Sequence, residues 1–412
     1  MEQPLRRLKS ELIIRALGEA ARRWTLPQFA PRAEITPAIA ERLGYTTPVV
    51  SHALDRLFAS ITREALEAVI INELGSLRIL DGFAPRNGRP PAYARGAENV
   101  LIISGDTTIG VAIPSMLFAL CAEANVLVKD RSDHLIAAFA RTLIEEESAL
   151  AHTLRVRTWE NHEASHDAIA RADLVVAFGR DETMRDIRSH CKAGARFLPF
   201  GHRTSIGYIA REALASASAA HDLARAAALD ALLYDGEGCL SPHALFVERG
   251  GLVAPEAFAA TFARACDDVS TTFPALVNEP TPPVASYRNR MRFRADALGL
   301  GGVHPGTNGP HLIVFDPPRE EPPPLLPRTV GVYPIDSPET MLAYVREHRL
   351  PLEAIGAAPN PREELLDAFI ATGAPRITSL GRMQDPPLTG NHGGYERITP
   401  FVRFIYRDDE HV

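Results

Sequence analysis

The feature that most constrains the fold is a strand, glycine turn, helix, strand unit over residues 99–129. The apolar run VLII is followed by the turn Ser104-Gly105-Asp106-Thr107. A stretch of helical character over residues 109–124 then leads to a second apolar run, NVLV, which ends at Lys129. Such a unit places two parallel strands in one sheet, whose ligands bind where the strands end.

The same alternation continues along the chain and predicts a doubly wound sheet, with later strands at 154–159, 174–178 and 196–200. An Ala-rich helix is expected over residues 208–229. A second, mostly parallel α/β domain is then predicted, with strands at 244–247, 312–315, 329–334 and 374–378 and helices at 255–266, 338–347 and 361–372. Residues 281–327 are rich in Pro and Gly and are otherwise unassigned.

The N-terminal quarter is predicted to be a helical cap. Residues 5–24 and 48–74 carry apolar stripes at helical spacing, and a proline-rich connection follows at 84–91. We therefore expect a helical region over 1–98, a nucleotide-binding domain over 99–233, a catalytic domain over 234–384 and a C-terminal segment over 385–412 that returns to the nucleotide-binding domain.

Composition excludes several classes of protein. The net charge of −7, without a long basic run, argues against nucleic acid as the main partner. The four cysteines form no C-x-x-C pair, so no disulfide framework is expected. Five histidines fall near turns and form no H-x-x-x-H pair among themselves, so no metal site is expected there: His202, His243, His304, His311 and His392. With neither a signal peptide nor an apolar run of about 18 residues, we expect a soluble cytoplasmic protein without a membrane span.

The segment DGEGCLSPHALFV, residues 235–247, is the strongest candidate for chemistry. It sets Cys239 in a turn with Gly236 and Gly238, ahead of a buried strand. Both glycines allow positive φ, and both leave room for a substrate carbonyl at the sulfur. The alternative is a buried structural cysteine, which is the commoner role of an isolated Cys. The glycines, the proline and the strand favour a nucleophile.

Two further features have ordinary alternatives. Lys129 ends the second strand, where a cofactor ribose or phosphate would lie, but lysines at strand ends are also simply solvated. The segment FGRDET, residues 178–183, predicts a helix N-terminus that could hold an anion. A capped helix without a ligand would show the same sequence pattern.

Taken together, these segments resemble the aldehyde dehydrogenase superfamily, and within it the LuxC family of acyl-CoA and acyl-protein thioester reductases. The matching stretches are VLIISGDTTIGVAIPSMLFAL with NVLVKDRSD, DLVVAFGRDETM, RFLPFGHRTSIGYI, DGEGCLSPHALFV and ITSLGRMQDPPLTGNHGGYERITPFVRF. The resemblance covers most of the chain from about residue 99, and the cysteine loop and the LGRMQDPP segment are its specific parts.

The resemblance implies an aldehyde dehydrogenase-like fold and a covalent mechanism. The Cys239 thiolate would attack an acyl thioester, on CoA or a carrier protein, and the acyl-enzyme would be reduced to an aldehyde. The Cys239 N–H and a polar group of the first turn would stabilise the oxyanion. The Glu-Leu-Gly-Gly segment of aldehyde-oxidising relatives is replaced here by FGHRTS, which favours a reductase.

The same resemblance assigns the cofactor contacts. Lys129 would meet the adenosine ribose, and Gly179 and Thr183 would lie near the pyrophosphate. Ser132 stands where NAD-preferring relatives often carry glutamate, and Arg131 beside it can pair with a 2′-phosphate, so NADPH is favoured over NADH. The remaining cofactor contacts implied are Ser104, Gly105, Thr204 and Ser205.

Three departures from the family pattern bear on the catalytic residues. Asp106 replaces an Asn, and an ionised Asp cannot donate to an oxyanion, so either Asp106 is protonated, Thr107 or Thr108 takes over, or the reaction is impaired. Glu237 replaces Gln or Asn, and its charge is expected to raise the pKa of Cys239. His392 is followed by Gly-Gly rather than Asp-Gly.

Two other functions stay open from the sequence. One is an acyl phosphate reductase like the glutamyl phosphate reductases of the same superfamily. The other is a degenerate member that binds nucleotide or a carrier protein without turnover, as Asp106 and Glu237 suggest. A homodimer is expected only by analogy with the superfamily.

Overall fold

The computed structural model describes residues 4–86, 89–105, 108–130, 134–159, 162–277, 279–317, 325–359 and 363–407. The chain forms two compact units. Unit 1 comprises residues 1–43, 50–202 and 387–412, and unit 2 comprises residues 44–49 and 203–386.

Unit 1 is built around a parallel sheet of five strands in the order β5-β4-β3-β6-β7. The strands are β3 (Asn99–Ile103), β4 (Asn125–Lys129), β5 (Leu154–Arg157), β6 (Leu174–Phe178) and β7 (Arg196–Phe200). The chain winds outward from β3 to β5, then returns to β6 on the other side of β3. This reversal is the switch point at which doubly wound sheets bind ligands, and the predicted sheet is confirmed.

Helices cover both faces of this sheet, because each crossover between parallel strands is right-handed. The helices α6 (Ile113–Cys121) and α7 (Leu135–Glu146) make the first two crossovers. The helices α8 (His162–Arg171) and α9 (Asp181–His190) make the next two. On the α8 and α9 side, Ile169 and Ile187 pack against Val175 of β6.

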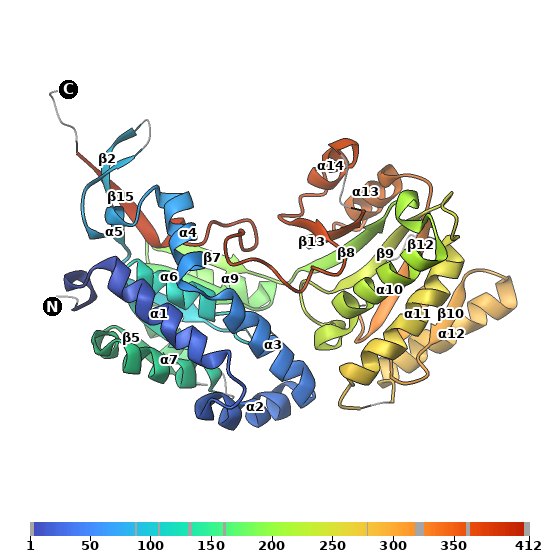
Figure 1. The fold of residues 1–412 in the computed structure, drawn as a ribbon, viewed down its shortest axis with the longest axis horizontal. Coiled ribbons are helices and arrows are strands. Elements are labelled where there is room, and N and C mark those ends of the chain that lie inside the picture. The colour runs from blue at the N-terminus through green and yellow to red at the C-terminus, as the bar shows by residue number, and fades with distance from the viewer. Residues whose placement is uncertain are drawn as a thin grey trace. The chain divides into compact units, whose positions relative to one another are not determined.

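The predicted N-terminal helices are present, and α1 and α2 pack on α7 in unit 1 (Figure 1). They are α1 (Ser10–Trp24), α2 (Ala30–Leu43), α3 (Thr47–Ser60), α4 (Arg63–Leu74) and α5 (Arg78–Asp81). Trp24 is fully buried against Phe58 and Phe139, at ring-centroid distances of 5.0 and 5.7 Å. The helix expected over 48–74 is two helices, because the Thr62 hydroxyl caps a new N-terminus at Ala65 N.

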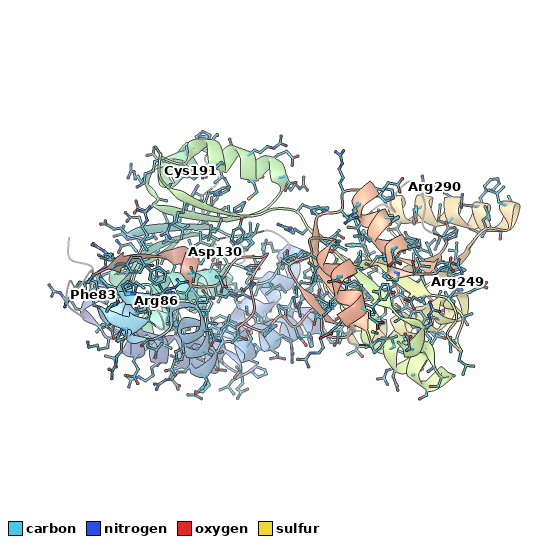
Figure 2. The ribbon with its side chains drawn as sticks, turned by 90° about the horizontal axis from the view of Figure 1, so that it is seen from above. Phe83, Arg86, Asp130, Cys191, Arg249 and Arg290 are labelled. Atoms are coloured by element: carbon cyan, nitrogen blue, oxygen red, sulfur yellow. The ribbon has the colours of Figure 1, made fainter. Side chains whose placement is uncertain are left out.

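The stretch predicted as a proline-rich connection forms strands instead. The strands β1 (Ala84–Arg86), β2 (Arg89–Gly96) and β15 (Val402–Tyr406) make an antiparallel sheet, in the order β1-β2-β15. The Arg86 guanidinium lies 4.0 Å from the Phe404 ring centroid, and Figure 2 labels Arg86 beside this sheet. The prediction failed because the partner of β2 comes from the far end of the sequence.

Unit 2 contains a sheet of seven strands in the order β10-β11-β12-β9-β8-β13-β14, parallel except for β10 at the edge. The strands are β8 (Thr204–Ile209), β9 (Pro242–Glu248), β10 (Gly302–Pro305), β11 (Leu312–Phe315), β12 (Thr329–Ile335), β13 (Leu352–Ala358) and β14 (Ile377–Ser379). The helices are α10 (Ala217–Leu232), α11 (Pro255–Thr272), α12 (Pro282–Leu298), α13 (Pro338–Glu347) and α14 (Glu363–Ile370). The predicted second α/β domain is thus present.

The structure corrects two boundaries in this part of the chain. The helix expected from Tyr208 begins at Ala217, because Tyr208 lies in β8 and is paired with both β9 and β13. For the same reason unit 2 begins at Arg203, before the expected boundary at residue 234. Residues 387–412 belong to unit 1.

Residues 44–49 cluster with unit 2 although the sequence suggested a purely N-terminal cap. The Thr46 hydroxyl donates to the Pro274 carbonyl at 2.9 Å, and the Tyr45 ring lies 6.2 Å from that of Tyr234. Across the described ranges, no helix is long and apolar enough to cross a membrane.

Candidate active site

Cys239 lies in a tight turn that leads directly into β9. The Ser241 N–H donates to the Gly238 carbonyl at 2.9 Å, which closes the turn, and β9 is buried along nearly its whole length. The predicted turn and buried strand are both confirmed. Of the two glycines expected to need positive φ, Gly236 has it, at 73°, whereas Gly238 does not.

The approach to this turn is backbone in the left-handed region. Tyr234 and Asp235 have φ values of 57° and 55° immediately before Gly236. Such angles are costly for residues with a Cβ and persist only where surrounding contacts hold them. A Cβ at Gly236 would lie 2.9 Å from the Ala231 carbonyl oxygen, so glycine is required there.

A buried arginine supplies those contacts. Arg328 is 1% exposed, and its Nε donates to Asp235 Oδ1 at 2.6 Å. Its backbone N–H donates to the Asp235 carbonyl at 2.7 Å, and its Nη2 donates to the Phe273 carbonyl at 2.8 Å. Arg328 therefore ties the segment before Cys239 to α11 and β12.

The LGRMQDPP segment supports the turn from the other side. The N–H groups of Gly381 and Met383 donate to the Asp230 carboxylate at the end of α10. The Gln384 Nε2 donates to the Asp230 carbonyl at 2.7 Å and to Ser241 Oγ at 2.9 Å. This segment, singled out by the family resemblance, thus holds the residue two positions after Cys239.

Ser205 contacts the cysteine directly rather than offering a surface to a cofactor. It is fully buried, its hydroxyl donates to the Cys239 carbonyl at 2.7 Å, and the Ala354 N–H donates to that hydroxyl at 3.1 Å. The Ser205 hydroxyl is thus used inside unit 2, and its expected contact with a cofactor stays a prediction. Thr204 is also buried, at 5% exposure, and its hydroxyl has no hydrogen-bond partner.

Ser205 lies between two bulges, one on β13 and one on β9, which change the direction of neighbouring side chains near the thiol. Thr204 and Ser205 of β8 pair with Leu352 and Ala354 of β13, so Glu353 is the extra residue. On the β9 side the register slips in the same way and leaves His243 as the extra residue. Bulges of this kind often redirect a side chain beside a reaction site.

Charge and burial act together on the Cys239 thiol. The residue is half-buried, and desolvation of its sulfur raises the pKa of the thiol to about 12. The Glu353 carboxylate also raises this pKa, whereas Arg203 and Arg376 lower it. Arg203 Nε lies 3.7 Å from Glu353 Oε2, so a carboxylate and its counter-ion both act on the sulfur.

The prediction for Glu237 is therefore corrected. Glu353, from a distant strand, is the carboxylate whose charge raises the thiol pKa. The pKa of Glu237 itself is raised by burial and by the charge of Asp235. Sequence spacing could not reveal Glu353, because 114 positions separate it from Cys239 and a bulge decides where it points.

Several predicted cofactor residues lie at the carboxyl edge of the unit 1 sheet. Ser104 is buried, and its N–H donates to the Lys129 carbonyl at 3.1 Å. A Cβ at Gly105 would lie 3.1 Å from the Phe178 Cβ at the end of β6, which requires a small residue there. Asp106, Thr107, Arg131 and Ser132 lie outside the described residues.

Lys129 and the start of α9 complete this edge. The Lys129 ammonium donates to Ser165 Oγ at 3.3 Å and lies 5.5 Å from the Trp159 ring centroid. Gly179 follows β6, and Thr183 is exposed in the first turn of α9. That turn also carries two acidic residues, whose charges weaken the attraction of the helix N-terminus for an anion.

His392 belongs to unit 1, whereas Cys239 belongs to unit 2. Its ring stacks on Phe200 at 4.3 Å and lies 5.7 Å from Phe178. Burial and the positive charge of Arg397 lower its pKa to about 3, so the imidazole is neutral near pH 7. A base this weak suits ring stacking better than proton transfer.

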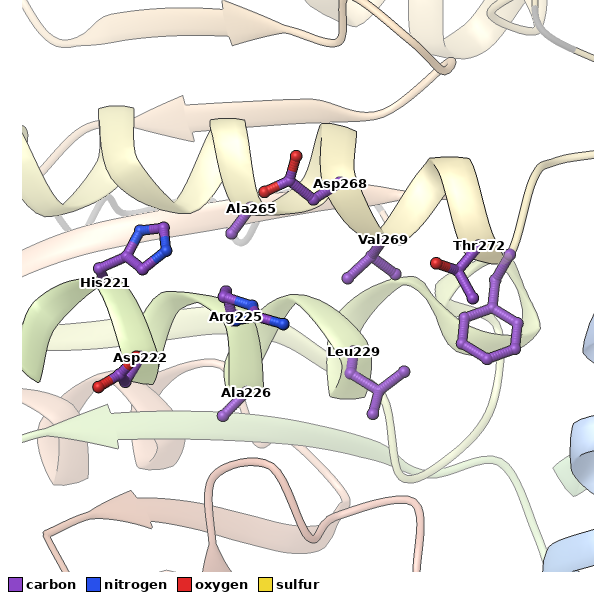
Figure 3. A pocket seen from close by; sticks show the side chains of 10 residues that line it. His221, Asp222, Arg225, Ala226, Leu229, Ala265, Asp268, Val269 and Thr272 are labelled. Carbon is purple, nitrogen blue, oxygen red and sulfur yellow. The ribbon is translucent and has the colours of Figure 1, made fainter. Parts of the chain in front are cut away.

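A groove of about 540 Å³ lies between α10 and α11 in unit 2, and Figure 3 shows side chains from both helices along it. The residues lining it are His221, Asp222, Arg225, Ala226, Leu229, Ala265, Asp268, Val269, Thr272 and Phe273. Cys239 is not one of them. The groove therefore does not contain the candidate nucleophile.

The sequence matches the family model described as acyl-CoA reductase (LuxC) over residues 5–404. The chain belongs to the LuxC family. The predicted family and its oxidoreductase class are therefore confirmed, and the chain is an enzyme of the acyl-CoA reductase type.

Sequence relatives of this LuxC-family chain carry matching names. It is 22% identical over 408 residues to the long-chain acyl-protein thioester reductase of Aliivibrio fischeri, covering 95% of this chain and 81% of the relative. It is 20% identical over 245 residues to long-chain acyl-protein thioester reductase 2 of Photobacterium leiognathi, covering 57% of this chain and 49% of the relative.

Solved structures confirm the predicted fold. The NAD-dependent benzaldehyde dehydrogenase of Corynebacterium glutamicum superposes with a TM-score of 0.67 at 14% identity, over 99% of this chain and 86% of that one. An NADP-dependent enzyme of E. coli gives 0.68 at 12% identity, over 98% and 86%. The LuxC-family chain therefore has an aldehyde dehydrogenase-like fold.

Proposed function

We propose that this chain is an NADPH-dependent acyl-thioester reductase that releases an aldehyde through an acyl-enzyme on Cys239. The observation that carries the proposal is the Cys239 turn, which is held by Arg328 and Gln384 in a chain of the acyl-CoA reductase family. A structural cysteine would not need costly left-handed backbone on its approach and a separate support on each side.

The proposed substrate is a long-chain acyl thioester on CoA or on a carrier protein. A thioester offers Cys239 an activated carbonyl and a good leaving thiol. The Aliivibrio fischeri relative is a long-chain acyl-protein thioester reductase, which also favours this substrate class. Chain length and carrier are the variables that the assay below scans.

In the proposed acylation step, Glu353 accepts the proton of Cys239 while the sulfur bonds to the acyl carbon. The acyl carbon then loses its bond to the leaving thiol, which takes a proton back from Glu353. Atoms and charges balance, with one thioester exchanged for another. Arg203, paired with Glu353, keeps a positive charge beside the thiolate as it forms.

The proposed oxyanion donors are the Cys239 N–H and a polar group of Asp106 or Thr107. Ser205 is a positioning residue, because it holds the Cys239 carbonyl and thereby the orientation of the turn. Glu237 is not needed in this scheme.

The proposed binding place of the nicotinamide nucleotide is the carboxyl edge of the unit 1 sheet. The doubly wound order places a switch point between β3 and β6, Gly105 makes room beside Phe178, and Lys129 ends the neighbouring strand. A reduced nicotinamide, when bound, supplies the hydride that converts the acyl group to an aldehyde. Cys239 then departs as a thiolate and takes a new proton from solvent.

The proposed preference for NADPH rests on Arg131 and Ser132. Arg131 would pair with the 2′-phosphate, and Ser132 would not repel it. Gly179 and Thr183 are proposed near the pyrophosphate, and neutral His392 as a stacking surface rather than a base.

One observation favours a second candidate, a nucleotide-binding member without turnover. A thiol with a pKa of about 12 is almost entirely protonated at neutral pH. If no group accepts its proton, Cys239 is inert and the protein only binds ligands. This candidate and the reductase differ in whether Cys239 becomes acylated.

The test is to mix the purified protein with NADPH and acyl-CoAs of increasing chain length while following nicotinamide absorbance and aldehyde. Cys239→Ala is the inactive variant, and Cys191→Ala, which changes a half-buried cysteine of unit 1, is the matched control. We expect consumption that depends on Cys239 alone and is faster with NADPH than with NADH.

Other outcomes would contradict the proposal. Turnover with an acyl phosphate but not with any acyl-CoA or acyl-carrier protein would indicate the glutamate-semialdehyde type of reaction instead. Nucleotide binding without acylation of Cys239, observed by mass spectrometry of the intact protein, would select the candidate without turnover.

A further inference from the structure

Three metal-ligating side chains meet on two helices of unit 1. They are His166 of α8 and Asp186 and His190 of α9, and one ligand atom of each lies within 4.8 Å of the others. The side chains are 36%, 56% and 33% exposed. The group is therefore open to ions from solvent.

The backbone beneath these side chains is fixed by the core. Ile169 of α8 and Met184 and Ile187 of α9 are buried together against the sheet, so the two helices cannot readily slide apart. Cys191, labelled at the end of α9 in Figure 2, packs against the same core, with its sulfur donating to the Ile187 carbonyl at 3.4 Å. It is thus turned away from the three ligands.

The two imidazoles are held close together. Their rings stack with centroids 3.6 Å apart and an angle of 11° between the planes. Asp186 bridges the pair, with an oxygen 3.9 Å from His166 Nε2 and another 3.7 Å from His190 Nδ1. An imidazole nitrogen that carries a lone pair can bind a cation.

We propose that His166, Asp186 and His190 form a binding site for a divalent transition metal of the zinc, copper and nickel class. Two imidazole nitrogens with one carboxylate oxygen suit these ions, whereas Ca²⁺ and Mg²⁺ prefer all-oxygen sites. The site would hold the ion with three protein ligands and leave the remaining position to water. It ties α8 to α9 and is independent of the proposed reductase chemistry.

Only side-chain movement is needed to complete the site. Ligand atoms around a tetrahedral zinc ion lie roughly 3.3 Å apart, as bond lengths of about 2.0 Å require. The present spacing exceeds this by about the amount that χ rotations of exposed side chains can supply. Asp186 and His190 are four residues apart on α9, so they already face the same side of the helix.

The experiment uses the full chain without an affinity tag, after treatment with a chelator and its removal. Zn²⁺ is titrated in competition with a chromophoric chelator, and Co²⁺ is added separately to record its visible absorption. The variants are His166→Ala, Asp186→Asn and His190→Ala. The matched control is His152→Ala, which removes another exposed histidine of unit 1.

We expect one Zn²⁺ per chain for the wild type and for His152→Ala, and a loss of affinity of at least about tenfold in each of the three variants. Co²⁺ should give the absorption of a site with nitrogen ligands, which a structural role of these side chains would not produce. The absence of saturable Zn²⁺ binding, or equal affinity in wild type and all variants, would overturn the proposal.

Discussion

Replacing Glu353 with glutamine removes a carboxylate whose charge raises the pKa of the Cys239 thiol. With a pKa of about 12, roughly one thiol in 10⁴ is ionised at pH 8. A neighbouring like charge at a partly buried site contributes on the order of 1–3 kcal/mol, and about 1.4 kcal/mol corresponds to a tenfold change. We therefore expect Glu353→Gln to increase the thiolate fraction about tenfold, while burial keeps the pKa above its ordinary value.

Two rates separate the roles of Glu353. Alkylation of Cys239 by iodoacetamide, followed by mass spectrometry between pH 7 and 10, reports only the thiolate population and should become about tenfold faster. Acylation by acyl-CoA, followed in the same way, also needs a proton acceptor and should become slower near pH 7. Glu347→Gln, an exposed carboxylate of unit 2, is the control and should change neither rate.

The opposite signs of the two effects make this test decisive. Unchanged alkylation would mean that the Glu353 charge does not act on the sulfur. If acylation accelerated together with alkylation, Glu353 would only suppress the thiolate, and its assignment as the proton acceptor would be refuted.

Four further outcomes are expected. Arg328→Ala should lower the free energy of unfolding by about 3–5 kcal/mol in urea denaturation and slow Cys239 acylation, since it leaves Asp235 without its buried partner. Exposed Arg264→Ala should change both little. Equal urea midpoints for the two variants would count against this role of Arg328. Asp230→Asn should lower the free energy of unfolding by about 1–3 kcal/mol, because an amide has only one acceptor oxygen where the carboxylate accepts at two. Exposed Asp222→Asn of the same helix is the control. An unchanged denaturation curve for Asp230→Asn would contradict this prediction. Ser205→Ala should slow acylation without changing NADPH affinity in a fluorescence titration. Weakened NADPH binding would instead support Ser205 as a cofactor contact. The pKa of His392 is lowered to about 3, so the ring is neutral above that pH and its titration should not appear in the pH profile of activity between pH 5 and 9. His392→Phe should retain most of the NADPH affinity, whereas His392→Ala should lose it. Equal losses of affinity in the two variants would refute the stacking role.

Much of the fold could be predicted because local patterns agreed with the final contacts. The strands of the unit 1 sheet are short apolar runs bounded by glycine or polar turns, and β6 is buried at every position. Helix α13 begins and ends where its pattern predicted. The strand β13 was missed, since its sequence LEAIGAA has no alternation and contains good helix formers; burial between β8 and β14 overrides that preference.

The candidate site divides in the same way. Cys239 was found because its glycines, proline and following strand are neighbours in sequence. Glu353, Arg203 and Arg376, whose charges act on the thiol, come from distant parts of the chain. The metal-ligand group was missed because it spans two helices. The available signs in the sequence were the H-x-x-x-H spacing at 162–166 and the D-x-x-x-H spacing at 186–190.

The sequence by itself determined the LuxC-family resemblance, the positions of the five parallel strands in unit 1, and the nucleophile candidate with its turn. All of these depend on residues close in the chain. The tertiary structure alone decided which carboxylate faces the thiol, that Ser205 positions Cys239, and that β2 pairs with β15. The physical reason is that charge and hydrogen bonding act through space between residues far apart in the chain. A single bulge, such as the one at Glu353, also changes which side chain of the strand faces the thiol.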